Sequence, residues 1–215
     1  MDVSDTSFSG FYARFETVSK ESGALLMGPD NIVGNDFEVF FMTEGSKVVA
    51  WLRNRFGAEV GYFGADASRK LQLMNAREMV IRAVLSFVAY SDMPEPGMYW
   101  GEMAIFGYNP AYEKELGAFV DRCAQKIGEG IRPDIDLRAQ SVSKLLEEND
   151  WMPSNTIPLP KMEKGNAVLK SHQSMSEKMI EQGRSRNIGC YIVSWAFIIL
   201  VVIGILFGLH ALGLF

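Results

Sequence analysis

An uncharged, strongly apolar run near the C-terminus constrains this chain more than any other feature. No Asp, Glu, Lys or Arg occurs between Ile188 and Leu209. A helix of these 22 residues would be about 33 Å long, which matches the hydrocarbon core of a bilayer. A helix buried in a soluble protein rarely lacks a polar face over such a length. The sequence therefore predicts one transmembrane helix over residues 188–210.

The residues around this run indicate its orientation. No Lys or Arg follows it, and Lys170, Lys178, Arg184 and Arg186 lie on its N-terminal side. Cytoplasmic flanks carry such an excess of positive charge, so the N-terminus is expected in the cytoplasm. Because few residues follow the span, we expect a single-pass, tail-anchored membrane protein. Gly204 and Gly208 form a GxxxG pattern, a candidate contact for a homo-oligomer through the span, although glycine is also common in membrane helices without such contacts.

The region before the span is acidic. Residues 1–150 hold 15 Lys/Arg against 23 Asp/Glu, a net charge of −8, whereas residues 151–215 carry a net charge of +3. Nucleic-acid binding needs a basic face that neutralises phosphates, so nucleic acid is an unlikely partner. The two cysteines, Cys123 and Cys190, lack the spacing of a metal site. A disulfide between them is not expected, which fits a reducing compartment.

Alternating apolar residues predict a β-rich region over residues 10–108. We expect strands at residues 11–18, 37–42, 79–90 and 99–108, a hairpin at 47–63 and a helix at 66–77. The hairpin would turn at Asn54 to Gly57, where glycine suits a positive φ angle. Asp66 is the expected N-cap of the helix.

Beyond residue 110 the period becomes helical. Apolar residues recur at three- and four-residue spacings: Leu116, Phe119, Val120, Cys123 and Ile127. We therefore expect a helical part over residues 111–148, and a linker with a juxtamembrane helix over residues 151–187 because prolines and glycine interrupt its first half. The predicted fold class is α+β: residues 1–150 form a small, mostly antiparallel β-sheet or barrel with packed helices, followed by the transmembrane helix.

The β-rich and helical regions lack the residues that most catalytic sites use. The two histidines are His172 and His210, both outside residues 1–150, so His-dependent triads, bases and metal sites are excluded from that domain. No catalytic, cofactor-binding or metal-binding residue is predicted, no cofactor is expected, and we do not expect an enzyme. An enzyme that uses only carboxylates or lysine remains an open alternative.

Aromatic side chains are concentrated in the predicted strands. Core packing accounts for most of them, and the remainder could line a groove for a peptide or for nucleic-acid bases. The candidate groove residues are Trp51, Arg53, Phe56 and Tyr62.

The same passage resembles the HIRAN domain. The order strand, strand, hairpin, helix, long strand and final strand over residues 10–108 follows that family, as do VAWL at 49–52, GAEVGYF at 57–63 and the leucine-bearing helical passage from Ser68 to Leu73. The resemblance implies a small β-barrel, in a family of which some members grip a free single-stranded DNA end. Where the family usually shows Asn-Pro-x-Asp, which helps shape the ligand site, this chain has MTEGSK at 42–47.

Three functions therefore remain in view. The first is a non-catalytic, membrane-tethered interaction or scaffold module with a cytoplasmic protein partner. The second is a HIRAN-like domain, held at the membrane, that binds single-stranded nucleic-acid ends. The third is a membrane-proximal enzyme that uses carboxylates or lysine.

Overall fold

The computed structural model describes residues 7–93, 95–184, 197, 199–201 and 203. It divides the chain into two compact units, Met1–Gln173 and Ser174–Phe215. Apart from those few positions, the expected transmembrane helix at 188–210 lies outside the described residues, and so do Gly204 and Gly208. Among the residues that the structure does describe, no helix has both the length and the apolar character that a membrane span requires.

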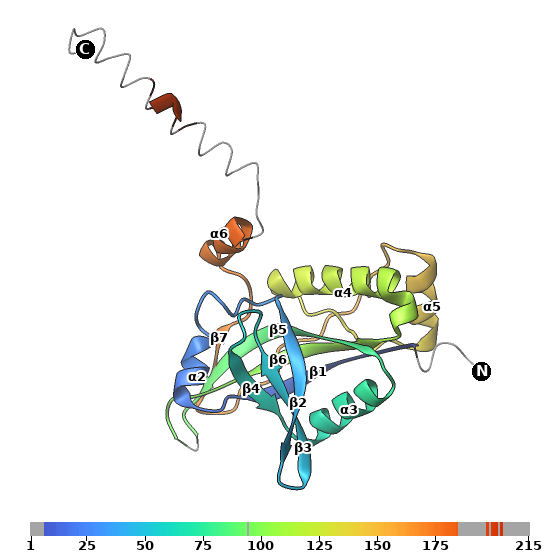
Figure 1. Ribbon diagram of the computed structural model, residues 1–215, viewed down its shortest axis with the longest axis horizontal. Helices are drawn as coiled ribbons and strands as arrows, with labels where there is room; N and C mark the ends of the chain where they lie inside the picture. The colour runs from blue at the N-terminus through green and yellow to red at the C-terminus, as the bar shows by residue number, and fades with distance from the viewer. Residues whose placement is uncertain (1–6, 94, 185–196, 198, 202, 204–215) are drawn as a thin grey trace, which may run out of the picture. The chain divides into compact units, whose positions relative to one another are not determined.

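Six antiparallel strands close into a β-barrel in the first unit (Figure 1). The strands are β1 (Phe8–Glu16), β2 (Asp36–Glu44), β3 (Lys47–Arg53), β4 (Glu59–Phe63), β5 (Val80–Ser91) and β6 (Met98–Tyr108). They neighbour one another in the order β2–β3–β4–β1–β6–β5, and β2 also pairs with β5 at Asp36–Val84 and Phe37–Ala83, which closes the ring. The predicted α+β class with a small antiparallel barrel and packed helices is confirmed.

Alternation along each strand sorts its side chains between the interior and the outer face of the barrel. Phe15 of β1 and Phe63 of β4 are paired in register and buried, and their rings meet edge to face at 6.5 Å. Leu52 and Met103 are buried in the same cluster. The interior is therefore a packed apolar core rather than a channel.

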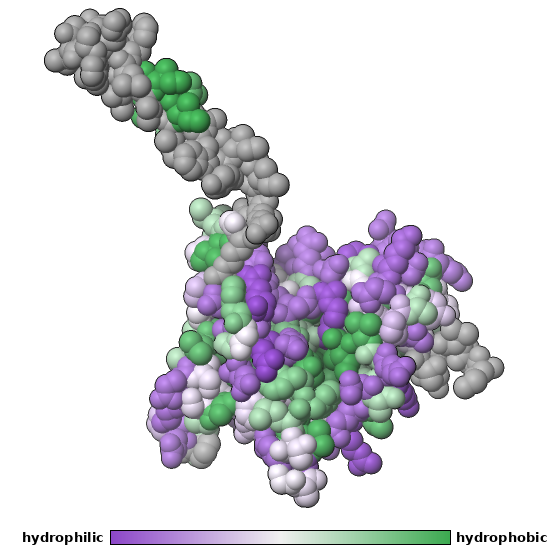
Figure 2. Space-filling view, in the orientation of Figure 1, coloured by the Kyte–Doolittle hydropathy of each residue, from purple (hydrophilic) through white to green (hydrophobic). Residues whose placement is uncertain are grey.

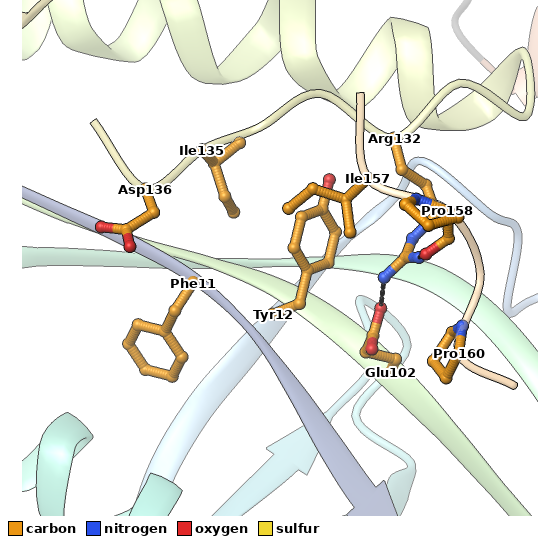
Figure 3. Close-up of a pocket in the computed structure, with 9 residues that line it drawn as sticks. All are labelled: Phe11, Tyr12, Glu102, Arg132, Ile135, Asp136, Ile157, Pro158 and Pro160. Atoms are coloured by element: carbon orange, nitrogen blue, oxygen red, sulfur yellow. Dashed lines mark hydrogen bonds and ion pairs between the residues drawn. The ribbon is translucent and has the colours of Figure 1, made fainter. Parts of the chain in front are cut away.

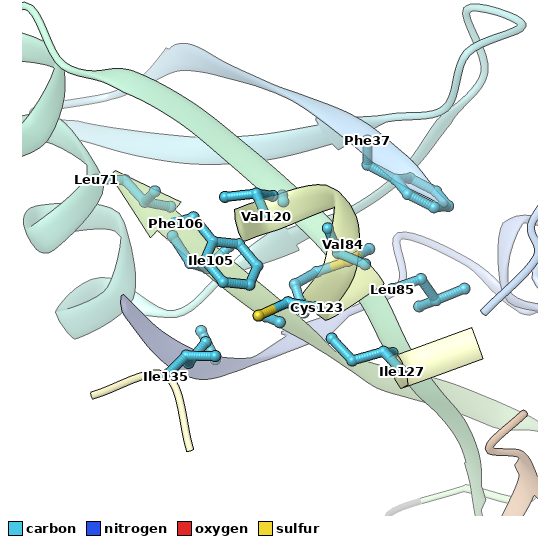
Figure 4. Packing of buried hydrophobic residues seen from close by; sticks show 14 of the residues in the cluster. Phe37, Leu71, Val84, Leu85, Ile105, Phe106, Val120, Cys123, Ile127 and Ile135 are labelled. Atoms are coloured by element: carbon cyan, nitrogen blue, oxygen red, sulfur yellow. The ribbon is translucent and has the colours of Figure 1, made fainter. Parts of the chain in front are cut away.

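Helices α2 (Lys20–Leu25), α3 (Ala65–Ala76) and α4 (Glu113–Gly128) pack on strands of the barrel, and α5 (Ala139–Glu147) packs against α4. A 3-10 turn, η1 (Pro110–Tyr112), precedes α4. Helix α4 lies over β5 and β6 (Figure 1). Its predicted apolar stripe is fully buried, and Figure 4 shows Val120 and Cys123 beside Phe106 of β6. The helical periodicity after residue 110 is thus confirmed.

Helix α2 and the N-cap of α3 differ from what the sequence predicted. Helix α2 was not predicted, and a capping box supports it: the Ser19 side chain accepts from the backbone N–H of Ser22, and the Ser22 side chain accepts from the N–H of Ser19. Helix α3 begins at Ala65 with Gly64 as its N-cap, so Asp66 lies inside the first turn rather than at the cap.

The predicted hairpin is confirmed as β3 and β4. The Asn54 side chain accepts hydrogen bonds from the backbone N–H groups of Phe56 and Ala58, both at 3.0 Å. Gly57 adopts a φ of 84°, a conformation that other residues rarely adopt. The turn is therefore fixed by local chemistry that the sequence already contains.

Residues 151–173 differ from the expected linker, because they belong to the first unit. An isolated bridge joins Pro133 to Thr156. A seventh strand, β7 (Asn166–Lys170), then adds to the sheet alongside β5. The Lys170 ammonium is buried and donates to the carbonyls of Leu26, Gly28 and Asn31. Lys170 is consequently not a free basic residue of a membrane flank.

The second unit contains α6 (Met175–Arg184). The Glu177 carboxylate accepts from the backbone N–H of Ser174 at 2.9 Å, and the Ser174 hydroxyl accepts from the N–H of Glu177 at 3.2 Å. This reciprocal pair caps the N-terminus of the helix, which begins at Met175.

Candidate functional site

A row of aromatic side chains crosses three neighbouring strands on the outer face of the barrel. Phe40 of β2 lies opposite Trp51 of β3, and Trp51 lies opposite Tyr62 of β4. The ring centroids are 6.4 Å apart for Phe40 and Trp51 and 5.4 Å apart for Trp51 and Tyr62. All three side chains are half-buried, whereas Ala50 and Leu52 on either side of Trp51 are fully buried. The strands thus turn three aromatic rings away from the core.

Charged side chains border this aromatic row. The Arg53 guanidinium lies over the Phe40 ring, 4.3 Å from its centroid. It also pairs with Glu38 at 3.5 Å and with Glu59 at 3.4 Å. On the other side, the indole N–H of Trp51 donates to the Glu44 carboxylate at 2.9 Å. These contacts hold the aromatic rings in defined positions on the surface.

The row continues around the barrel onto β1 and β6. Glu16 of β1 pairs with Tyr62 on one side and with Trp100 of β6 on the other. The Arg14 guanidinium lies 4.0 Å from the centroid of a Trp100 ring and pairs with Glu16 at 2.7 Å. Trp100 itself is buried beside Phe87. The exposed part of the row is therefore the segment on β2, β3 and β4.

The structure brings together three of the four predicted groove residues. Trp51, Arg53 and Tyr62 share this face, but Phe56 lies in the β3–β4 turn, is 55% exposed and contacts Arg55. Sequence reasoning missed Phe40. Its place in the row depends on the β2–β3 register, which the short turn between these strands could have suggested.

Apolar surface also gathers on the barrel between polar margins, as the space-filling view shows (Figure 2). A separate hollow of about 360 Å³ lies under the segments that follow α4 and α5 (Figure 3). Its lining combines apolar side chains with a buried charged pair: Phe11, Tyr12, Glu102, Arg132, Ile135, Asp136, Ile157, Pro158 and Pro160.

Arg132 links the walls of this hollow. Its guanidinium forms a buried ion pair with Glu102, donates to the carbonyl of Pro158, and donates to the Ser86 hydroxyl at 3.1 Å. The guanidinium also lies over the Tyr12 ring, 4.5 Å from the centroid. All three nitrogens have partners within the chain, so Arg132 acts here as a clamp between the barrel and residues 132–158.

Burial controls the titration of the groups around this clamp. Burial raises the pKa of Glu102 above its ordinary value, against the opposing pull of the Arg132 charge and of its hydrogen bonds. Burial also raises the pKa of Tyr12, whose hydroxyl donates to the carbonyl of Pro133 at 2.9 Å. The Tyr12 hydroxyl therefore keeps its proton at neutral pH.

Within the described ranges, no cluster of three or more His, Cys, Asp and Glu side chains is arranged to hold a metal ion. Comparisons of the chain with protein-family models, with curated proteins and with solved structures find no match. The fold and the candidate site therefore rest on this chain's own residues.

Proposed function

We propose that this protein is a non-catalytic interaction module that binds a protein partner on the outer face of β2, β3 and β4. Residues 188–210 would hold it at a membrane as a single-pass tail anchor, with the N-terminus in the cytoplasm. The observation that carries the proposal is the in-register row of half-exposed rings, Phe40, Trp51 and Tyr62, with Arg53 beside it.

Physical reasons favour a binding role for this row. Trp, Tyr and Arg are the residue types that dominate binding energy in protein interfaces. Aromatic side chains bring a large contact area and lose little conformational entropy when they are already held in place. Here Glu44 fixes Trp51, and Glu38 and Glu59 fix Arg53. The row is consequently preorganised for a partner.

Photocrosslinking of the full-length protein in the membranes of its own cells tests this proposal. A photoreactive residue at Met42, which is 39% exposed two positions after Phe40, would report on molecules bound at the row. We expect a discrete protein adduct that Trp51→Ala and Tyr62→Ala abolish and that Phe56→Ala, an aromatic change off the row, leaves intact. An adduct that persists in all three variants would contradict the proposal.

A second candidate is binding of single-stranded nucleic-acid ends, and the closed barrel with its aromatic and arginine side chains favours it. It predicts salt-sensitive binding of labelled oligonucleotides that weakens in Tyr62→Ala or Arg53→Ala. Glu38, Glu44 and Glu59 weigh against it, because carboxylates repel phosphates. Absence of oligonucleotide binding by the full chain at low salt would remove this candidate.

The third candidate, an enzyme that uses carboxylates or lysine, has less support. The Lys170 ammonium is occupied by three backbone carbonyls, and Glu102 is occupied by Arg132. These buried groups fit a structural role. A direct search for turnover by the full chain would be the test of this candidate.

A further inference from the structure

The aromatic row already binds cations from its own chain at both ends. At one end Arg53 lies over Phe40, 4.3 Å from the ring centroid, and at the other end Arg14 lies over Trp100 at 4.0 Å. The faces of aromatic rings attract such cations because of the ring quadrupole. In the described part of the chain no Arg or Lys stacks on the two rings between them, Trp51 and Tyr62.

Negative charge exceeds positive charge around these two central rings. Arg53 is shared between the carboxylates of Glu38 and Glu59. Glu44, the hydrogen-bond acceptor of Trp51, forms no ion pair among the described residues. Three carboxylates, Glu38, Glu44 and Glu59, thus frame the rings, against the Arg53 guanidinium and Lys47, which lies opposite Glu44 in the β2–β3 register. All three carboxylate side chains lie at the surface. A cation that docks on the rings would gain both cation–π attraction and ion pairing.

We infer that the partner recognised by this face is a basic peptide segment, whose arginine or lysine side chain stacks on Trp51 and Tyr62 and pairs with Glu44. The inference rests on the proposed function and names the chemistry of its partner. Arginine suits the site better than lysine, because its planar guanidinium can stack on a ring while its N–H groups reach a carboxylate. The chain's own Arg53 and Arg14 show this combination on the neighbouring rings.

Calorimetric titration of the full chain, held in nanodiscs of uncharged lipid, tests the inference with defined probes. The probes are the blocked peptide Gly-Arg-Gly-Arg-Gly, the same peptide with citrulline or with glutamate at both arginines, and a single-stranded oligonucleotide. Citrulline keeps the shape of arginine and removes its charge. We expect the arginine peptide to bind at least about fivefold more tightly than the citrulline peptide, and the glutamate peptide not to bind.

Two kinds of variant locate the binding. Trp51→Ala should abolish the preference for arginine, and Phe56→Ala should preserve it. Glu44→Gln removes charge at an exposed position without disturbing the core, so it should weaken arginine-peptide binding by about threefold in a fully folded protein. Equal affinity for the arginine and citrulline peptides, or tighter binding of the oligonucleotide, would overturn the inference.

The outcome also separates this inference from the proposed function. If the Met42 crosslink depends on Trp51 but the arginine peptide has no advantage, the face binds a protein through other chemistry and only the inference fails. If the crosslink is insensitive to both Trp51→Ala and Tyr62→Ala, the proposed function fails together with the inference.

Discussion

Replacing Arg132 by methionine should destabilise the protein strongly. The change removes the ion pair with Glu102, whose side chain is 11% exposed against 5% for Arg132, and it leaves that carboxylate without its charged partner. Breaking a buried pair in this way typically costs about 3–5 kcal/mol. Such a loss is a large share of the free energy of unfolding of a native domain, which is about 5–15 kcal/mol. Methionine keeps much of the apolar volume, so the effect reports mainly on the lost charge.

Urea unfolding of the full chain in a mild detergent, followed by circular dichroism, measures this loss. The double variant Arg132→Met with Glu102→Leu should recover at least half of it, because no buried charge is then left unpaired. Arg82→Met is the matched control. Like Arg132, Arg82 forms ion pairs, here with Asp36 and Asp121, but these carboxylate side chains are 47% and 69% exposed. Removing the Arg82 charge should therefore lower the free energy of unfolding by about 1 kcal/mol or less. Equal losses for Arg132→Met and Arg82→Met would refute the role of Arg132 as a buried clamp.

Three further predictions follow from other buried groups. Lys170→Met removes an ammonium that donates to three backbone carbonyls, and we expect a loss of about 3 kcal/mol in urea unfolding together with faster hydrogen exchange in β7. Burial raises the pKa of the Cys123 thiol to about 12, from 9.0 when exposed, so a thiol reagent at pH 8 should label Cys123 only in unfolded protein. The thiol of the unfolded protein loses its proton at a lower pH than the buried thiol, so the stability that Cys123 contributes below pH 9 should be lost as the pH rises from about 9 towards 12. The expected loss is up to about 1.4 kcal/mol per pH unit. Urea midpoints measured across this range test the prediction, because an exposed thiol would contribute no such slope. Gly10→Ala places a methyl group 2.1 Å from the carbonyl oxygen of Ile135 and should lower the free energy of unfolding by at least about 2 kcal/mol. In the control, Gly64→Ala, the new methyl group meets nothing within 4 Å and should change the thermal midpoint little. Similar thermal midpoints for both variants would contradict the close approach at Gly10.

Local patterns along the chain predicted much of the barrel and its largest helix. The turn from Asn54 to Gly57 needs only residues within the loop, and the α4 stripe needs only a 3.6-residue period. The aromatic site was partly predictable for the same reason: Trp51, Arg53 and Tyr62 belong to one hairpin, so pairing of β3 with β4 was enough to join them.

Other features depend on contacts between distant residues. The clamp joins Arg132 to Glu102, which lies 30 positions away, and Lys170 reaches Asn31 across 139 positions. No periodicity signals such pairs. Residues 151–173 looked like a linker because prolines and polar residues dominate there, but β5 offers β7 a free strand edge. Tertiary hydrogen bonding then outweighs the local preference.

The sequence by itself determined the α+β composition, the hairpin, the buried stripe of α4 and the shared face of Trp51, Arg53 and Tyr62, because each depends on neighbours within a few residues. The tertiary structure alone decided that six strands close into a ring, that Phe40 completes the row and that Arg132 and Lys170 fasten the later segments to the barrel. These features depend on strand register and on the burial of charge, and both are set only when distant parts of the chain meet.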